Sequence, residues 1–166
     1  MPTQIKKEAT EEAEKLLDVA WPLRVIPIDP IAIARTAGLR VLDAALEEDT
    51  LGALVKQPYR DPVIMLNASD PDNRKRFTCA HELGHWVRRS DEAEEYTTVD
   101  LRGPLSATGD DPDEVFANEF AASLLMPEDD VRRLKMLGRN DVLLSIEFKV
   151  SREAMQYRLK NLGLME

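Results

Sequence analysis

The sequence predicts an α+β fold in which a small antiparallel sheet of three strands packs on helices. Three short apolar runs lie together in the first half of the chain, and segments with helical spacing of apolar residues flank them. The turns between the runs are short and rich in Asp, Glu and Pro, and short turns join antiparallel neighbours. The three predicted strands are Leu39–Ala44, Leu51–Lys56 and Pro62–Asn67.

Capping residues and prolines delimit the predicted helices. Asp29-Pro30 and Asp70-Pro71 each place an N-cap aspartate before a first-turn proline, which favours a helix start. The acidic stretch 90–111 contains Gly103-Pro104 and Gly109 and is predicted to be a loop. The predicted helices are Ile5–Trp21, Ile31–Ala37, a segment from Asp70 to about Arg89, Asp113–Met126 and three short helices after Pro127.

Length and composition indicate a core domain with a small helical addition. The chain has 166 residues, of which 43% are hydrophobic and 32% charged. We expect a core over residues 1–130 and a helical segment over 131–166 that packs on it. There is one cysteine and neither an apolar leader nor an apolar run of membrane-spanning length, so we expect a cytoplasmic protein.

Charge is distributed unevenly along the chain. The net charge of −9 argues against a surface that binds nucleic acid as a whole. Residues 131–161 nevertheless hold eight Lys and Arg against three Asp and Glu, a net of +5. This segment is either a solvated basic face or a docking surface for DNA or an acidic partner.

The segment His81-Glu82-Leu83-Gly84-His85 contains both histidines of the chain. Residues four apart lie on one face of a helix, so the two imidazoles can bind one metal ion and Glu82 can act as general base on a water. The alternative is a chance pair of helix histidines. Zinc is the expected metal, and Mn²⁺ or Fe²⁺ also suit such a site.

A third ligand has to come from elsewhere. Cys79 lies two residues before His81, on a different side of the same helix, and is expected to pack in the core. In the helix 113–126, Glu114 shares a face with small residues that permit close packing on the motif helix, whereas Glu119 is expected to be solvated. We therefore choose Glu114; the alternative is a charge that only interacts with the helix dipole.

Two sequence blocks resemble the ImmA/IrrE metallopeptidases. One is the run from Arg76 to His85, and the other is the run from Glu114 through Ala117-Asn118 to Leu124-Leu125-Met126-Pro127. A weaker match covers 148–163. The resemblance implies a zincin-like core, with His81, His85 and Glu114 as metal ligands and Glu82 as the catalytic glutamate. It also implies a bacterial or phage-encoded cytoplasmic endopeptidase that cleaves a helix-turn-helix repressor and so derepresses phage, mobile-element or stress genes.

Two features of the reaction stay open at this level. Tyr96, Tyr59 or an arginine could stabilise the oxyanion, and Asn118 could orient a ligand or only pack. An extended substrate could add to a sheet edge formed by Leu51–Lys56 or Val63–Asn67.

The C-terminal segment supports a competing interpretation. Residues 140–162 are typical of helix, turn, helix, with Ser151 as N-cap and a core pattern of Ile146, Val150, Ala154, Leu159 and Leu162. Three hypotheses follow: a repressor-cleaving peptidase, a non-cleaving metal-stabilised module that sequesters a repressor or toxin, and a DNA-binding regulator. The non-ligand Glu82 favours the first, because a structural metal site needs no general base.

Overall fold

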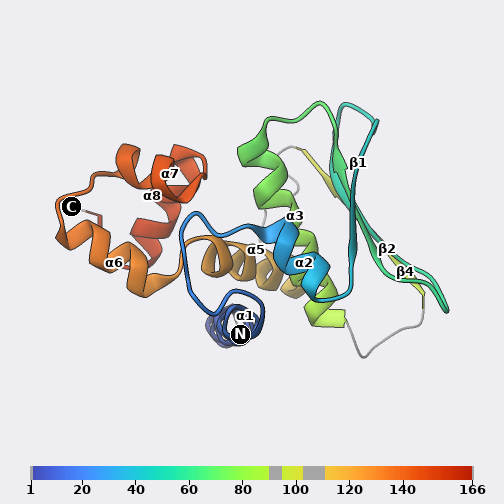
Figure 1. Cartoon of the computed structure of the whole chain (residues 1–166), viewed down its shortest axis with the longest axis horizontal. Helices are drawn as coiled ribbons and strands as arrows, with labels where there is room; N and C mark the ends of the chain where they lie inside the picture. Colours follow the sequence, from blue (N-terminus) through green and yellow to red (C-terminus); the bar gives the residue numbers. More distant parts are fainter. Residues whose placement is uncertain (1, 90–94, 103–110, 166) are drawn as a thin grey trace.

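The computed structural model of the chain describes residues 2–89, 95–102 and 111–165. It has an α+β architecture in which the sheet lies on one side of two central helices and the last three helices lie at the opposite end of the molecule (Figure 1). The helices are α1 (Pro2–Ala20), α2 (Pro30–Thr36), α3 (Asp72–Arg89), α5 (Pro112–Leu125), α6 (Glu128–Met136), α7 (Asp141–Phe148) and α8 (Arg152–Asn161). The strands are β1 (Arg40–Ala44), β2 (Thr50–Lys56), β3 (Val63–Asn67) and β4 (Tyr96–Leu101).

The predicted three-stranded antiparallel sheet is wrong in strand number and in order. The sheet has four strands in the order β1-β3-β2-β4, and β1 pairs with β3 in parallel. Strand β2 is antiparallel to both β3 and β4. The segments proposed as substrate-binding edges, β2 and β3, are therefore interior strands, and the edges of the described sheet are β1 and β4.

Strand β4 lies inside the stretch that we predicted to be a loop. Its side chains alternate between half-buried and exposed, with Tyr96, Thr98 and Asp100 on the buried face. The remaining parts of that predicted loop, 90–94 and 103–110, lie outside the described residues. An edge strand thus replaces the centre of the predicted loop.

The helix starts predicted at Asp29 and Ser151 are confirmed by their hydrogen bonds. The predicted cap Asp70 is wrong, because α3 begins at Asp72 and the Asp70 carboxylate pairs with Arg102 and Arg74 instead of backbone N–H groups of the helix. The Asp29 carboxylate accepts from the backbone N–H groups of Ile31 and Ala32 at the start of α2. Asp111 caps α5 in the same way, ahead of a first-turn proline. Ser151 accepts from the N–H of Ala154 at the start of α8. These caps satisfy backbone donors that a helix leaves free at its N-terminus.

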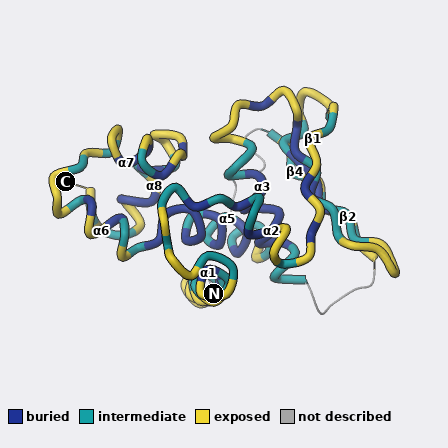
Figure 2. Tube along the Cα trace, in the orientation of Figure 1, coloured by how far each residue is buried: buried dark blue, intermediate teal, exposed yellow. Residues whose placement is uncertain are grey.

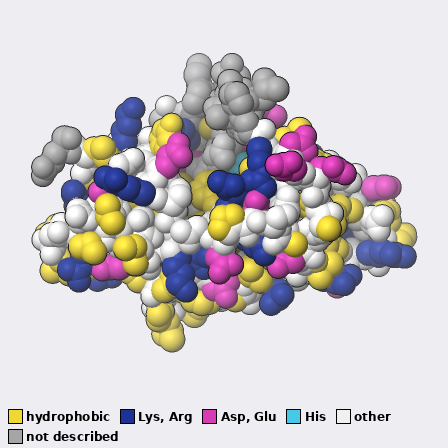
Figure 3. All heavy atoms as spheres, turned by 90° about the horizontal axis from the view of Figure 1, so that it is seen from above, with side chains coloured by type: hydrophobic (Ala, Val, Ile, Leu, Met, Phe, Trp, Pro, Cys, Tyr) yellow, Lys and Arg dark blue, Asp and Glu magenta, His cyan; other side chains and the backbone are white. Residues whose placement is uncertain are grey.

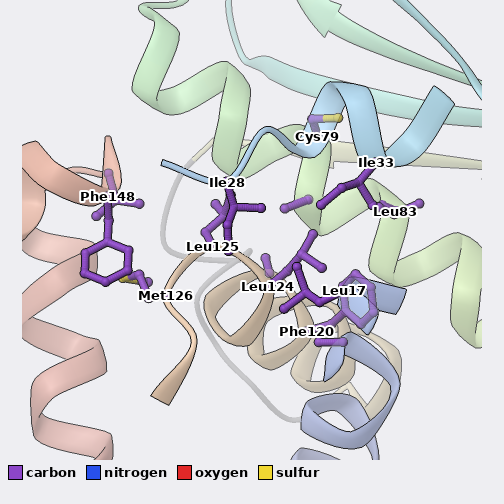
Figure 4. Close-up of a cluster of buried hydrophobic side chains, with 14 of the residues drawn as sticks. Leu17, Ile28, Ile33, Cys79, Leu83, Phe120, Leu124, Leu125, Met126 and Phe148 are labelled. Carbon is purple, nitrogen blue, oxygen red and sulfur yellow. The ribbon is translucent and has the colours of Figure 1, made fainter. Parts of the chain in front are cut away.

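The hydrophobic core lies between α1, α2, α3 and α5. Leu17, Ile33, Leu83 and Phe120 are fully buried and meet between these helices (Figure 4). Figure 2 shows α5 coloured mostly as buried or intermediate, and residues 78–85 of α3 are all buried. Cys79 belongs to this core, as expected, and burial raises the pKa of its thiol to about 12. The histidine motif therefore lies on a fully buried stretch of α3, residues 78–85.

Two glycines bring the elements around α3 into close contact. A Cβ at Gly84 would lie 3.0 Å from the Cα of Ala117, so α3 and α5 approach at the face of small residues predicted for α5. A Cβ at Gly52 would lie 2.6 Å from a methyl group of Thr78, so α3 lies directly on β2. Side chains on α3, α5 and the adjacent strand β4 can consequently converge.

No helix in the described part of the chain is long and apolar enough to cross a membrane.

Candidate metal centre

The two motif histidines point at each other in the middle of α3. Their Nε2 atoms are 3.1 Å apart, and both side chains are buried. Four-residue spacing on one helix face produces this arrangement, as the sequence predicts. Imidazole nitrogens facing across such a short distance share one position in which a cation can bind both.

Glu114 completes this group from the first turn of α5. Its carboxylate lies 2.9 Å from His85 Nε2 and 3.3 Å from His81 Nε2. The next residue back, Asp113, accepts hydrogen bonds from Arg88 and Arg89 at the end of α3, which fixes the start of α5 against that helix. The sequence-predicted third ligand is thus brought to the histidines.

Glu119 lies elsewhere and is not solvated, contrary to our expectation. Its side chain is only 12% exposed and accepts a hydrogen bond from Arg158 on α8. The arginine is itself buried and donates a second hydrogen bond to the Met126 carbonyl. Glu119 therefore has a structural partner on the side of α5 that faces the C-terminal helices.

Glu82 lies beside the group without contacting it through a hydrogen bond. Its side chain is fully buried, and neither carboxylate oxygen has a hydrogen-bond partner among the described residues. Burial raises the pKa of Glu82 to about 8, opposed by His81 and assisted by the charges of Asp100 and Glu114. A buried carboxyl group that titrates near neutral pH can accept a proton and release it again.

The other pKa values follow from the same packing. Burial would lower the pKa of His81, but the contact with Glu114 and the charges of Asp100, Glu82 and Glu114 raise it to about 9. Contacts with His81 and His85 hold the pKa of Glu114 well below its usual range, although burial opposes them. In the metal-free protein, His81 and Glu114 thus stabilise each other's charged forms.

Asp100 is the residue that sequence reasoning missed. Its Oδ2 lies 3.7 Å from His81 Nε2, and its side chain is 10% exposed. Burial raises its pKa, with His81 opposing and Glu114 adding to the shift. The signal was the alternating, β-branched run Tyr96-Thr-Thr-Val-Asp-Leu101, which is typical of a strand with one inward face.

The two tyrosines considered for oxyanion stabilisation lie in different parts of the structure. Tyr59 is fully exposed in the turn between β2 and β3. Tyr96 lies on the inward face of β4, and its buried hydroxyl has no hydrogen-bond partner among the described residues. It is four residues from Asp100, about 13 Å along the strand. The ring also lies against the Arg89 guanidinium, 5.8 Å from the ring centroid.

The donor set fits a divalent transition-metal ion. Ligand atoms about 2.0–2.2 Å from a tetrahedral ion lie roughly 3.3–3.6 Å from one another, close to the separations of 2.9, 3.1 and 3.3 Å in this group. Two nitrogens and one carboxylate also match the chemistry of such ions. The unpartnered oxygens of Glu82 and Glu114 are groups that a bound ion and its water would satisfy.

The fold and the grouping of His81, Glu82, His85 and Glu114 match the HExxH pattern of metal-dependent peptidases. A family model, the IrrE N-terminal-like domain of the M78 peptidases, matches residues 34–160. Because the match covers more than half of the chain, the protein belongs to this metallopeptidase family, which confirms the resemblance to ImmA/IrrE proteins. No curated protein matches the sequence.

Proposed function

We propose that the protein is a zinc-dependent endopeptidase that cleaves a helix-turn-helix transcriptional repressor in the cytoplasm, derepressing phage, mobile-element or stress genes. The observation that carries the proposal is the convergence of His81, His85 and Glu114 beside a buried, unpartnered Glu82. A structural metal site would not need that fourth residue. Membership of the peptidase family supports the reaction class.

His81, His85 and Glu114 hold the metal in this proposal. Zinc is the expected ion, with Mn²⁺ or Fe²⁺ as alternatives. When bound, it supplies Lewis-acid chemistry that polarises the scissile carbonyl and acidifies water. Glu82 accepts a proton from the attacking water and delivers it to the leaving nitrogen. The water oxygen forms a bond to the carbonyl carbon, and the C–N bond breaks.

The substrate segment binds as an extended strand along β4. This strand pairs with β2 on one side only within the described sheet, and its inward face carries Asp100 next to His81. Backbone hydrogen bonds to an edge strand hold a peptide without much demand on its sequence. Choice of repressor then depends on contacts away from the scissile bond.

DNA binding by the C-terminal helices receives less support. Of the predicted core pattern, Val150 and Leu159 are buried and Ala154 and Leu162 are partly buried, but Ile146 is 66% exposed, and α7 and α8 also bury Leu144, Phe148 and Met155. Acidic residues pair with all five arginines that contribute to the positive charge of residues 131–161: Arg132 with Glu128, Arg133 with Asp130, Arg139 with Glu147, Arg152 with Asp141 and Arg158 with Glu119. On the face shown in Figure 3, basic side chains are interspersed with acidic and hydrophobic ones.

A cleavage assay tests the function. Helix-turn-helix repressors encoded near this gene are incubated with zinc-loaded wild type and with Glu82→Gln. We expect wild type alone to cut one of them, and a chelator to abolish cutting, while both proteins bind one metal ion. A metal-loaded wild type that binds a repressor tightly without cutting it would reject the peptidase in favour of sequestration.

A further inference from the structure

Asp100 is directed at the metal centre by the register of the sheet. It is paired with Gly52 of β2, and paired residues on adjacent strands point to the same face. Gly52 faces Thr78 of α3, one helical turn before His81, and lacks a side chain that would separate sheet and helix. The ladder is also irregular between Thr50 and Gly52, next to this pair, and such bulges often re-aim side chains near functional sites.

Asp100 lacks the arginine partner that three other enclosed acidic side chains of the described residues have. Asp70 pairs with Arg102, Asp113 with Arg88 and Arg89, and Glu119 with Arg158. In the described part of the chain, the only ion-pair partner recorded for Asp100 is His81. An enclosed carboxylate without a cation or a donor is costly, so its position requires an explanation other than packing.

His81 cannot be that explanation once a metal is bound. The nitrogen nearest to Asp100 is Nε2, the same atom that faces His85 and Glu114. An imidazole nitrogen that ligates a metal carries no proton and cannot donate a hydrogen bond. The Asp100 carboxylate is then left facing whatever occupies the space beside His81.

That space is shared with Glu82. Two groups of ligand-type atoms, each within 4.8 Å of one another, meet at His81: one adds His85 and Glu114, and the other adds Glu82 and Asp100. Asp100 therefore lies on the side of the general base. Both oxygens of Glu82 are buried and unpartnered among the described residues, so two carboxylates border one small volume.

We propose that Asp100 is a second catalytic carboxylate, which orients the attacking water together with Glu82. Water has two O–H groups, and each carboxylate accepts one of them. Glu82 takes its proton and later passes it to the leaving nitrogen, while the second proton stays on the oxygen that bonds to the carbonyl carbon, held by Asp100. Asp100 transfers no proton and ligates no metal. This inference rests on the proposed peptidase function.

The first test separates turnover from binding. Asp100→Ala should lower kcat about 10- to 100-fold, the value of one hydrogen bond to a charged group, and change KM less than about threefold. The matched control is Val99→Ala, because Val99 is the neighbouring residue on the outward face of β4 and is 53% exposed. It should retain wild-type kcat and KM. An Asp100→Ala protein with wild-type kcat would overturn the proposal.

The second test needs no cleavage. Acetohydroxamate is titrated into Co²⁺-loaded wild type, Asp100→Ala and Val99→Ala, and binding is followed by visible absorption. The hydroxamate N–H and O–H groups need acceptors beside the metal, so Asp100→Ala should bind it about tenfold more weakly. All three proteins should bind one Co²⁺ with equal affinity. An unchanged hydroxamate affinity, or loss of Co²⁺ from Asp100→Ala, would reject the assignment.

The two tests distinguish a failure of the proposed function from a failure of the role assigned to Asp100. If wild type cleaves no repressor, the proposed function is wrong, but the hydroxamate titration still decides whether Asp100 borders the site beside the metal. If wild type cleaves and Asp100→Ala behaves like Val99→Ala in both tests, the function stands and the assignment of Asp100 falls.

Discussion

Two carboxylates of α5, one in its first turn and one in its middle, are in opposite situations. Glu114 faces the histidines of α3, in a centre where Glu82 has no hydrogen-bond partner among the described residues. Glu119 faces α8, where Arg158 satisfies it and also bonds to the Met126 carbonyl. Enclosed charge is expensive in both places, but only Glu119 is paired with an arginine of the described chain, whereas Glu114 has histidines as partners and the neighbouring Glu82 has no partner. The unpartnered carboxylate thus lies at the candidate metal centre and not at the cluster around Arg158.

The largest difference should appear when each of the two glutamates is replaced by alanine in turn. Glu114→Ala removes a proposed metal ligand and should abolish cleavage. Loss of a residue that only hydrogen-bonds to a ligand lowers metal affinity by up to about 100-fold, so loss of a ligand itself should lower it by more than that. Glu119→Ala should keep full metal content. The measurement is zinc per chain after dialysis against a graded chelator. Full retention by Glu114→Ala, or loss confined to Glu119→Ala, would show that the third ligand is misassigned.

A substitution in the Glu119 cluster should lower stability without changing metal affinity. Arg158→Met removes the cation, leaves the Met126 carbonyl without its side-chain donor and leaves Glu119 with only the Ser123 hydroxyl, which should lower the free energy of unfolding by about 3 kcal/mol. Urea unfolding of metal-free protein measures it. Adding Glu119→Gln should recover part of the loss. A metal affinity in the folded variant that differs from wild type would contradict the separation of the two clusters.

Glu82 should differ from Glu114 and Glu119 in making the free energy of unfolding depend on pH. Burial raises its pKa to about 8 in the folded metal-free protein, so the folded state keeps a proton that the unfolded chain releases above its ordinary value of 4.5. Wild type should therefore lose stability relative to Glu82→Gln as pH rises from about 4.5 to about 8, with a slope of at most about 1.4 kcal/mol per pH unit.

The difference between the two proteins is the quantity to measure. The pKa of His81 is also raised, to about 9, and lowers the stability of both proteins as pH rises above 6.5. Urea unfolding of metal-free wild type and Glu82→Gln at several pH values gives the difference. A difference that stays constant with pH would mean that Glu82 is ionised throughout and has a partner in solution.

Local spacing explains why the metal centre was predictable and the sheet was not. His81 and His85 lie on one helix face whatever the tertiary structure, and the small residues beside Glu114 predicted the close approach seen at Gly84 and Ala117. The parallel pairing of β1 with β3 depends on contacts between distant segments, and no local pattern encodes it. Asp100 was missed because acidic, Gly- and Pro-containing neighbours hid a six-residue strand.

The smallest predicted effect concerns the contact that joins the two helices of the site. Alanine at Gly84 would place its Cβ 3.0 Å from the Ala117 Cα and 3.1 Å from the Phe120 ring. Backbone cannot yield as a flexible side chain does, so α5 must shift. Overpacking costs about 1–3 kcal/mol, whereas alanine gains up to about 1 kcal/mol over glycine in a helix, so a net loss near 1 kcal/mol is expected. The shift would also move Glu114 away from the histidines, and metal affinity should fall several-fold. Urea unfolding and zinc titration of Gly84→Ala give both values; a more stable variant with wild-type affinity would show that the two helices can separate without disturbing the centre.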